Sequence, residues 1–321
     1  MDNHRFVFAG AAHLDNIGVF DVDAPAGLST PGRMTRSPGG AALNTARVLR
    51  ALCFGDTVFN CSLHSVGKAG ANPLHDLTEQ EGIALQLQQP VSNGDPSYTA
   101  LLQPDGSVVA ALADMNAYAE FDARAVTCGA SDWLILDANL SSDCLAVLGS
   151  ITTAKTVAIA VSSAKVARLR SCLANVDLLF CNRAEASVLA GSFAGAPDAV
   201  SWDQLSERLR RLEIRQAVIT DGAGSICVLD GDDTGFVNPV AVSNPISVVG
   251  AGDTLTAGTL AALSLGTGLM AAVGFGAQLA GVALRSAQAV DPVAIRAQSG
   301  ALADLALTAM RNNQEQSRDG Q

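Results

Sequence analysis

A run of small residues that ends in an acid, Gly250-Ala251-Gly252-Asp253, precedes a long stretch of small and apolar residues typical of a buried helix. Glycines at the first positions of a helix leave its backbone N–H groups uncovered, and the helix dipole favours negative charge there. A phosphate group can therefore approach closely, with Asp253 beside it to accept a proton from an attacking hydroxyl. The alternative is a strand-to-helix turn that Asp253 only caps.

A second glycine pair, Gly39-Gly40, precedes a predicted helix that carries Asn44 near its start. Gly40 and Asn44 are four residues apart, so the amide can point toward the helix end at which the backbone is exposed. An amide both donates and accepts hydrogen bonds, which suits the vicinal hydroxyls of a polyol. The glycine pair alone also fits an ordinary turn, and only its combination with Asn44 favours binding.

Two more polar features follow apolar runs further along the chain. Asn182 and Glu185 come directly after the run 178–180, at the start of a predicted helix. They fit a helix cap and its first-turn acid, but beside a nucleotide they can orient the water shell of Mg²⁺. Thr220 ends another apolar run and is followed by Gly222 and Gly224. Open α/β sheets bind ligands at such carboxyl ends of strands.

Short apolar runs alternate with helical stretches over most of the chain and supply the elements that would hold these residues. The predicted strands are 6–9, 133–136, 156–159, 178–180 and 217–219, and the predicted helices include 41–52, 142–151, 183–190 and 203–212. Continuously apolar strands are typical of a parallel sheet that is buried on both faces. We therefore predict an α/β fold with a doubly wound, mostly parallel sheet flanked by helices.

Two extended segments interrupt this alternation. Residues 13–36 lack helical periodicity, and residues 97–113 have the pattern of a hairpin with the turn PDGS. We expect the segments of about 13–38 and 95–118 to form a small β-sheet lid over the site. The chain 1–321 is then a single domain, with a polar, frayed end at 311–321.

Composition argues against several classes of function. The 321 residues carry a net charge of −11 without a basic run, which argues against a nucleic-acid or membrane-surface partner. No apolar run is long enough to span a bilayer, and the chain enters a predicted strand at once, without a signal peptide. We therefore expect a cytoplasmic protein. The segment AGAAHLDNIG after the first strand lacks the three-glycine fingerprint of a dinucleotide-dependent oxidoreductase.

The order of the motifs resembles that of the ribokinase-like (PfkB) carbohydrate kinase family over essentially the full length of the chain. The matching pieces are SPGGAALNTARVL (37–49), NRAE (182–185), TDGAGS (220–225) and VVGAGDTLTAG (248–258). The last piece is the most specific. The resemblance implies an α/β core with a small β lid, ATP as phosphoryl donor, Mg²⁺, and phosphorylation of a primary hydroxyl on a sugar or nucleoside.

The resemblance also implies a role for each matching position. Asp253 resembles the catalytic base, and the anion hole would comprise Gly250, Ala251 and Gly252. Asn182 and Glu185 resemble the pair that orients magnesium and phosphate, with Glu185 holding the metal through water. The nucleotide loop would comprise Thr220, Asp221, Gly222 and Gly224, and the sugar-hydroxyl site would comprise Asp15, Gly39, Gly40 and Asn44.

Other stretches narrow the resemblance, within the family, to kinases of the nucleoside pseudouridine. They are GAAHLDNIG (10–18), STPGRMTRSPGG (29–40), PSYTALLQPDGSVVAALADMNAY (96–118) and LDANLS (136–141). The implied acceptor is the ribose 5′-hydroxyl of pseudouridine. Asp114 and Asn116 would reach the base or ribose, and Asp137 or Asn139 would line the same cleft. A homodimer formed through the lid strands is a further expectation from the resemblance.

The chain departs from the family at several positions, and alternatives stay open. Ala160-Val161 replaces a common Asp-Pro pair, and Ser225 replaces the second glycine of the usual T-x-G-x-x-G pattern that begins at Thr220. VGKAGANP (66–73) lacks a common acidic pair. Ser247 replaces an acid, which leaves a monovalent-cation site in doubt. The alternatives are a family kinase for ribose, fructose, a ketosugar acid or adenosine, or a non-catalytic sugar or nucleoside sensor, which would have no need of Asp253.

Overall fold

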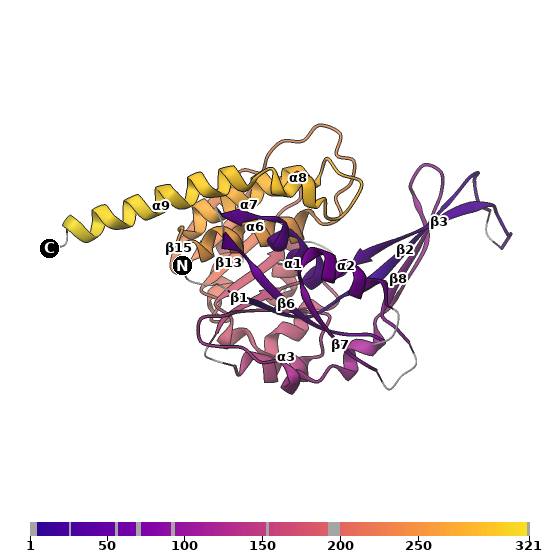
Figure 1. Ribbon diagram of the computed structural model, residues 1–321, viewed down its shortest axis with the longest axis horizontal. Helices are drawn as coiled ribbons and strands as arrows, with labels where there is room; N and C mark the ends of the chain where they lie inside the picture. Colours follow the sequence, from indigo (N-terminus) through magenta and orange to yellow (C-terminus); the bar gives the residue numbers. More distant parts are fainter. Residues whose placement is uncertain are drawn as a thin grey trace.

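The computed structural model describes residues 5–319 except 26, 55–56, 69–71, 91–93, 152–153 and 192–199. Within this part of the chain, nine strands form one sheet in the order β15-β14-β13-β12-β11-β10-β1-β6-β7, and helices cover both of its faces (Figure 1). The strands from β13 to β7 in this order run parallel, whereas β14 and β15 are antiparallel at one edge. The predicted doubly wound, mostly parallel sheet is therefore confirmed.

The strands of the large sheet are β1 (Arg5–Ala9), β6 (Asn60–Val66), β7 (Ala84–Gln88), β10 (Trp133–Asp137), β11 (Lys155–Ile159), β12 (Leu178–Asn182), β13 (Gln216–Thr220), β14 (Ile226–Asp230) and β15 (Asp233–Val237). Each of the five predicted strands corresponds to one of the parallel strands. The antiparallel pair β14-β15 lies outside the predicted strands.

The helices are α1 (Ala41–Ala51), α2 (Pro73–Glu81), α3 (Ser142–Gly149), α4 (Arg183–Leu189), α5 (Trp202–Arg210), α6 (Ala251–Ser264), α7 (Leu269–Ala283), α8 (Pro292–Arg296) and α9 (Ser299–Asp319), with short 3-10 turns at η1 (Asn116–Glu120), η2 (Ala123–Ala125), η3 (Val166–Ser171) and η4 (Leu173–Asn175). Helices α1, α6 and α7 pack on one face of the sheet, and α3, α4 and α5 pack on the other.

Alternate residues of each central strand belong to opposite faces of the sheet. Phe6 and Phe8 of β1 lie in the core under α1 and α6, whereas Val7 and Ala9 lie in the core under α3. Side chains of successive strand residues point to opposite faces, so a sheet that is covered twice needs apolar residues at every position. This explains why the strands are continuous apolar runs in the sequence.

The last element that the structure describes is a long helix. Helix α9 continues through Asp319 and projects away from the body of the protein (Figure 1). It buries Leu302 and Ala306 near its start, while Leu307 and Met310 are exposed. Among the residues described, neither α9 nor any other helix is long and apolar enough to cross a membrane.

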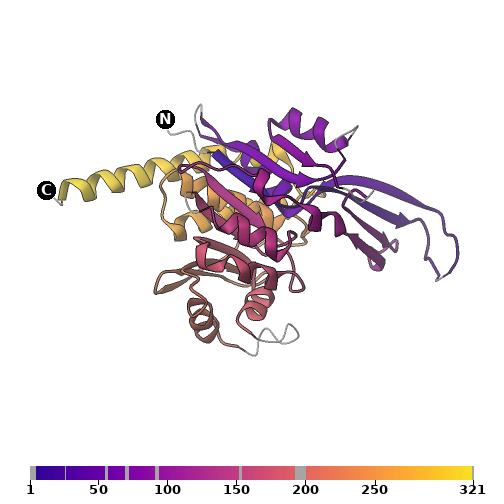
Figure 2. The same ribbon diagram turned by 90° about the horizontal axis from the view of Figure 1, so that it is seen from below.

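A second, smaller sheet extends from one side of the large sheet (Figure 2). Its strands are β2 (His13–Phe20), β3 (Gly32–Gly39), β8 (Ser97–Leu102) and β9 (Val108–Asp114), in the order β3-β2-β8-β9. A further short pair joins β4 (Cys53–Phe54) to β5 (Thr57–Val58). Because β2 follows β1 directly, the base of the small sheet lies at the carboxyl-terminal ends of the parallel strands. The residues that follow β1, β10, β11, β12 and β13 therefore lie together at these ends.

Candidate active site

The first turn of α6 presents open backbone next to an acid. Its N-cap, Gly250, has a left-handed φ of 79°, and a Cβ there would lie 2.2 Å from the carbonyl oxygen of Ala289, so only glycine fits. At Gly252 a Cβ would meet no atom within 4 Å, which shows open space in front of the turn. The turn therefore has the form of an anion site, with Asp253 as its third residue.

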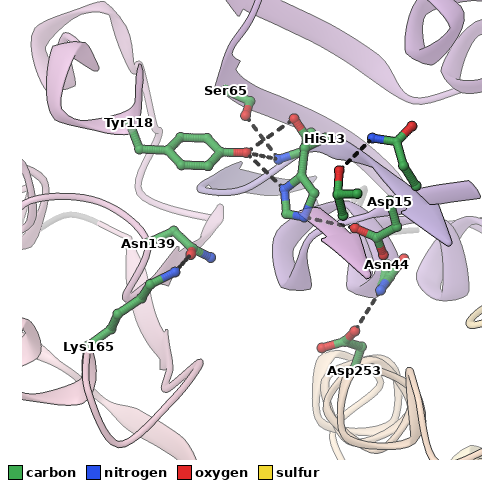
Figure 3. Close-up of polar contacts among 11 residues, drawn as sticks. His13, Asp15, Asn44, Ser65, Tyr118, Asn139, Lys165 and Asp253 are labelled. Atoms are coloured by element: carbon green, nitrogen blue, oxygen red, sulfur yellow. Dashed lines mark hydrogen bonds and ion pairs between the residues drawn. The ribbon is translucent and has the colours of Figure 1, made fainter. Parts of the chain in front are cut away.

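Asn44 of α1 links this turn to the other side of the site. Its Nδ2 donates a hydrogen bond of 2.8 Å to Asp253 Oδ2 (Figure 3). The Asn44 side chain is only 4% exposed, and its Oδ1 has no hydrogen-bond partner among the described residues. Because buried polar atoms are normally paired, this carbonyl oxygen is placed to accept a hydrogen bond from a ligand. A hydroxyl group is a suitable donor.

The environment of Asp253 makes it a proton acceptor near neutral pH. Burial raises the pKa of Asp253 from its ordinary value of 3.8 to about 7. The charge of Asp137 also raises this pKa, and the hydrogen bond from Asn44 opposes both effects. General-base catalysis is most efficient when the pKa of the base lies near the working pH. Asp253 can therefore take a proton from a hydroxyl as it attacks a phosphoryl group.

Asp137, at the end of β10, ties that strand to β1. It is 0% exposed, and its two oxygens accept hydrogen bonds from the backbone N–H groups of Ala11 (2.7 Å) and Asn139 (2.8 Å). A Cβ at Gly10 would lie 2.4 Å from Asp137 Oδ2, so the glycine permits this close approach. Burial raises the pKa of Asp137, while these amide hydrogen bonds lower it. Asp137 thus fixes the backbone around the site.

Asp15 of β2 lies beside the glycine pair of the first motif. A Cβ at Gly39 would lie 2.3 Å from Asp15 Oδ2, so a larger residue would displace the carboxylate. Gly40 has a φ of 106°, and a Cβ there would lie 2.3 Å from the carbonyl oxygen of Ala11. The two glycines therefore bring α1, with Asn44, against the loop that follows β1. Figure 3 shows Asp15, Asn44 and Asp253 on one side of the site.

A hydrogen-bonded cluster around Tyr118 includes His13, which in turn contacts Asp15. Tyr118 of η1 is fully buried, and its hydroxyl lies 3.0 Å from Ala12 N, 3.2 Å from Ala12 O and 3.2 Å from His13 Nδ1. Ser65 Oγ also accepts from Ala12 N at 3.1 Å. His13 Nε2 lies 3.2 Å from Asp15 Oδ1, a contact that becomes an ion pair when the imidazole is protonated (Figure 3). Asp15 Oδ1 makes no hydrogen bond with the described residues. Tyr118 thereby connects the end of the lid to the loop after β1.

The two lid residues predicted to reach the base or ribose lie at the end of the small sheet. Asp114 is the last residue of β9 and Asn116 is the first residue of η1, and both are exposed. Tyr118, two residues further on, is the side chain of this segment that contacts the site. Asn139 of the strand end LDANLS faces the space in front of Asp253, on the opposite side from Asn44 (Figure 3).

A larger cavity of about 550 Å³ adjoins the first turn of α6. It is lined mainly by apolar residues of α7 and of the segment 239–248, and also by Thr220, Gly222, Ala251 and Gly252. Of the other nucleotide-loop residues, Asp221 Oδ2 pairs with Arg183 Nη1 at 2.9 Å, and Gly224 N donates to Asp221 O within the turn. The cavity suits a flat, mostly apolar group such as a nucleotide base.

A smaller cavity of about 140 Å³ shares Thr220 and Gly252 with the larger one and is also lined by Asn182, Glu185 and Asp253. Asn182 and Glu185 form a complete capping box at α4, with hydrogen bonds of 2.9 and 2.8 Å. Glu185 is nearly buried, which raises its pKa. Among the described residues no group of three or more His, Cys, Asp or Glu could hold a metal. One carboxylate, that of Glu185, and the amide oxygen of Asn182 fit Mg²⁺, which commonly uses few carboxylates and keeps several waters as ligands.

Four polar residues of the site, together with the apolar wall 239–248, were missed by sequence reasoning. They are His13, Ser65, Tyr118 and Lys165. No local spacing connects them, because each acquires its partner only when distant segments assemble. The segment GAAHLDNIG contains His13 two residues before Asp15. Nothing in that segment indicates the contact of His13 with Tyr118.

The family model of the pfkB family carbohydrate kinases matches residues 8–296 of the chain. The pseudouridine kinase of Escherichia coli (strain K12) is 27% identical over 268 residues, which cover 78% of this chain and 81% of that protein. A carbohydrate kinase from Agrobacterium tumefaciens superposes with a TM-score of 0.77 at 29% identity, over 93% of this chain and 97% of that chain.

A ribokinase from Cryptococcus neoformans var. grubii serotype A, solved in complex with ADP, superposes with a TM-score of 0.72 at 16% identity, over 94% of this chain and 99% of that chain. The last likeness concerns the fold alone, whereas the family model covers most of the sequence, including the turn that bears Asp253. The chain therefore belongs to the pfkB family of carbohydrate kinases, phosphotransferases that act on an alcohol group.

Proposed function

We propose that this kinase transfers the γ-phosphoryl group of ATP to the ribose 5′-hydroxyl of pseudouridine or a closely similar nucleoside. The observation that carries the proposal is the Asn44–Asp253 pair. Asn44 donates to the carboxylate and leaves its own buried carbonyl oxygen unpartnered, so a primary hydroxyl can be held next to Asp253. Similarity to the pseudouridine kinase of Escherichia coli supports the choice of nucleoside.

The acceptor would lie between Asp15, Asn44 and Asn139, under the base of the lid. Asp15 would accept hydrogen bonds from sugar hydroxyls, because its buried Oδ1 has no hydrogen-bond partner among the described residues and Gly39 leaves room for the carboxylate. Asp253 accepts the proton of the primary hydroxyl during attack. It does not need to remove the proton beforehand, because phosphoryl transfer has a loose transition state and depends mostly on positioning.

The phosphoryl donor would extend from the cavity of about 550 Å³ to the first turn of α6. The adenine would occupy the apolar cavity, and the terminal phosphate would contact the amides of Gly250–Gly252 where no side chain intervenes. Glu185 and Asn182 line the smaller cavity and would hold Mg²⁺ through water. Bound there, the ion would neutralise charge on the phosphates.

A homodimer formed through the lid is part of the same proposal. Strand β9 is exposed along its whole length and lies at the edge of the small sheet. Val108, Val109 and Leu112 on this strand are large apolar side chains in contact with solvent. Unpaired strand edges readily pair with another chain. Light scattering should give the mass of a dimer, and a monomer at micromolar concentration would refute this part.

The decisive experiment compares acceptors by ADP release at saturating ATP and Mg²⁺. The panel contains pseudouridine, uridine, adenosine, ribose and fructose, each at several concentrations. We expect the highest kcat/KM for pseudouridine, with a new phosphomonoester on its 5′-oxygen by phosphorus NMR. A higher kcat/KM for ribose or fructose would refute the nucleoside. Binding without ADP release for every acceptor would refute catalysis in favour of a sensor.

A further inference from the structure

Lys165 makes a cationic contact with Asn139, a residue of the predicted acceptor site. It follows β11 and precedes η3, and its Nζ donates a hydrogen bond of 2.6 Å to Asn139 Oδ1 (Figure 3). The side chain is half-buried, which lowers its pKa, while the nearby carboxylate of Asp137 raises it and Arg168 lowers it. Lys165 belongs to the segment in which Ala160-Val161 departs from the family pattern.

This contact dictates which way the amide of Asn139 faces. An ammonium group has three N–H donors and no acceptor, so Asn139 must turn its oxygen toward Lys165 and its NH₂ group away from it. The opposite orientation would bring two donors together. Asn139 also stabilises the ionised form of Asp137 through its side chain, which agrees with the NH₂ lying on the Asp137 side. An NH₂ group has two hydrogens, so one remains for a ligand.

The backbone of Asn139 is fixed independently of its side chain. Its N–H donates to Asp137 Oδ1 at 2.8 Å, and its carbonyl oxygen accepts from Arg168 Nη1 at 2.9 Å. The side chain is 4% exposed. A 180° flip of the amide is therefore the main freedom left to this residue, and Lys165 removes it. In Figure 3 the amide nitrogen of Asn139 lies on the side of the Lys165 contact that faces Asn44 and Asp253.

We propose that Lys165 is a positioning residue that makes Asn139 a hydrogen-bond donor toward the phosphoryl acceptor, so that the site selects acceptors with a ring carbonyl at this position. The proposal deepens the proposed nucleoside kinase function and rests on it. A base that carries an amino group there would bring two donors face to face. Sites that hydrogen-bond a polar group discriminate well against analogues that leave the protein group unpaired.

The test compares pseudouridine with pseudocytidine and pseudoisocytidine, in each of which one ring carbonyl is replaced by an amino group. We expect the wild type to prefer pseudouridine over one of these analogues by about tenfold or more in kcat/KM. K165M keeps the apolar length of the side chain but removes the donors, and it should reduce this preference to about twofold. K165R, which still donates to Asn139 Oδ1, should retain most of the preference.

K155M is the matched control, because Lys155 stands at the other end of β11 with its ammonium over the ring of Trp133. It should leave the preference unchanged. A purely structural role of Lys165 would lower the rates with all three nucleosides equally and would leave their ratio as in the wild type. That unchanged ratio in K165M overturns the proposal.

N139D keeps the inference testable should K165M fail to fold. Its carboxylate has no N–H to offer, so the preference for the carbonyl should disappear, and retention of that preference overturns the proposal. The proposed function fails separately: a wild type that phosphorylates none of the three nucleosides refutes the nucleoside acceptor and this inference with it. Turnover of pseudouridine with a ratio independent of Lys165 refutes the inference alone.

Discussion

The phosphate end and the acceptor end of this site are built from different kinds of contact. At the phosphate end, Gly250–Asp253 form one helical turn, and the hydrogen bonds between Asn182 and Glu185 span three residues. At the acceptor end, the contacts of the loop after β1 reach partners 53, 106 and 126 residues away, on Ser65, Tyr118 and Asp137. The first end depends on local backbone form, and the second depends on the assembled tertiary structure.

This difference predicts different consequences of mutation. A change at the phosphate end should remove chemistry and leave the fold intact, because little else depends on the altered group. A change at the acceptor end should lower stability and acceptor affinity together, because the same hydrogen bonds join β1, β6, β10 and η1. The variants below separate the two cases.

Asp253→Asn should have the largest effect. Loss of the proton acceptor should lower kcat by about a thousandfold, with little change in ATP binding. Steady-state ADP release and calorimetric titration of ATP measure the two quantities. Asp203→Asn, which changes an exposed first-turn acid of α5, is the matched control and should keep wild-type turnover. Wild-type turnover in Asp253→Asn would contradict the assigned role.

The same variant should be more stable than the wild type at pH 8. Asp253 ionises near pH 4 in the unfolded chain but only near pH 7 in the folded protein, so the wild type loses stability as the pH rises through this interval. Asparagine carries no charge to bury. The difference between a pKa of 3.8 and one of about 7 corresponds to a gain of at most about 4 kcal/mol at pH 8, and this gain should vanish toward pH 4. Urea denaturation at both pH values measures it, and an equal difference at both would exclude the titration.

Gly252→Ala should lower kcat/KM for ATP by about a hundredfold while leaving the protein at least as stable. The added methyl group meets no protein atom within 4 Å, so it would instead occupy the space assigned to the terminal phosphate. Alanine in a helix is favoured over glycine by about 1 kcal/mol. Gly274→Ala in α7, where a Cβ also meets nothing, should show the stabilisation without the loss. Similar activity in both variants would remove the anion site from Gly252.

Tyr118→Phe should have the smallest effect on catalysis and the clearest effect on the fold. Loss of the hydroxyl leaves polar groups of Ala12 and His13 underpaired, at a cost of about 1 to 2 kcal/mol in the free energy of unfolding. KM for the acceptor should rise about threefold to tenfold, and KM for ATP should not change. Tyr98→Phe on β8 is the control. An equal rise in both KM values would break the distinction between the two ends.

The phosphate end could be predicted from the sequence because its signal is local. The prediction for Gly250, Gly252 and Asp253 required only that a helix begins there. The apolar runs of the parallel strands indicated the sheet that positions this helix. At the acceptor end, the direction of the Asn44 amide was predicted from its spacing to Gly40, but its contact with Asp253 across 209 residues was not. None of these interpretations required knowledge of which distant segments meet.

The acceptor end could be predicted only in part. Asp15, and Asp137 or Asn139, were assigned to the acceptor site only through resemblance. Tyr118 has no pattern of its own, since a tyrosine with a polar role and a core residue look alike in sequence. Asp137 is an acid of the kind that often binds ligands, yet both of its carboxylate oxygens accept hydrogen bonds from the backbone amides of Ala11 and Asn139. Lys165 acquires its partner across 26 residues through the packing of β10 against β11.

The central claim is that Asp253 accepts the proton of the attacking hydroxyl. It is tested most directly by the pH dependence of kcat/KM for pseudouridine at saturating ATP and Mg²⁺. Because the carboxyl must be ionised to act, kcat/KM should rise about tenfold per pH unit below pH 7 and level off above it. A rate that does not change between about pH 5.5 and 8 would contradict the account.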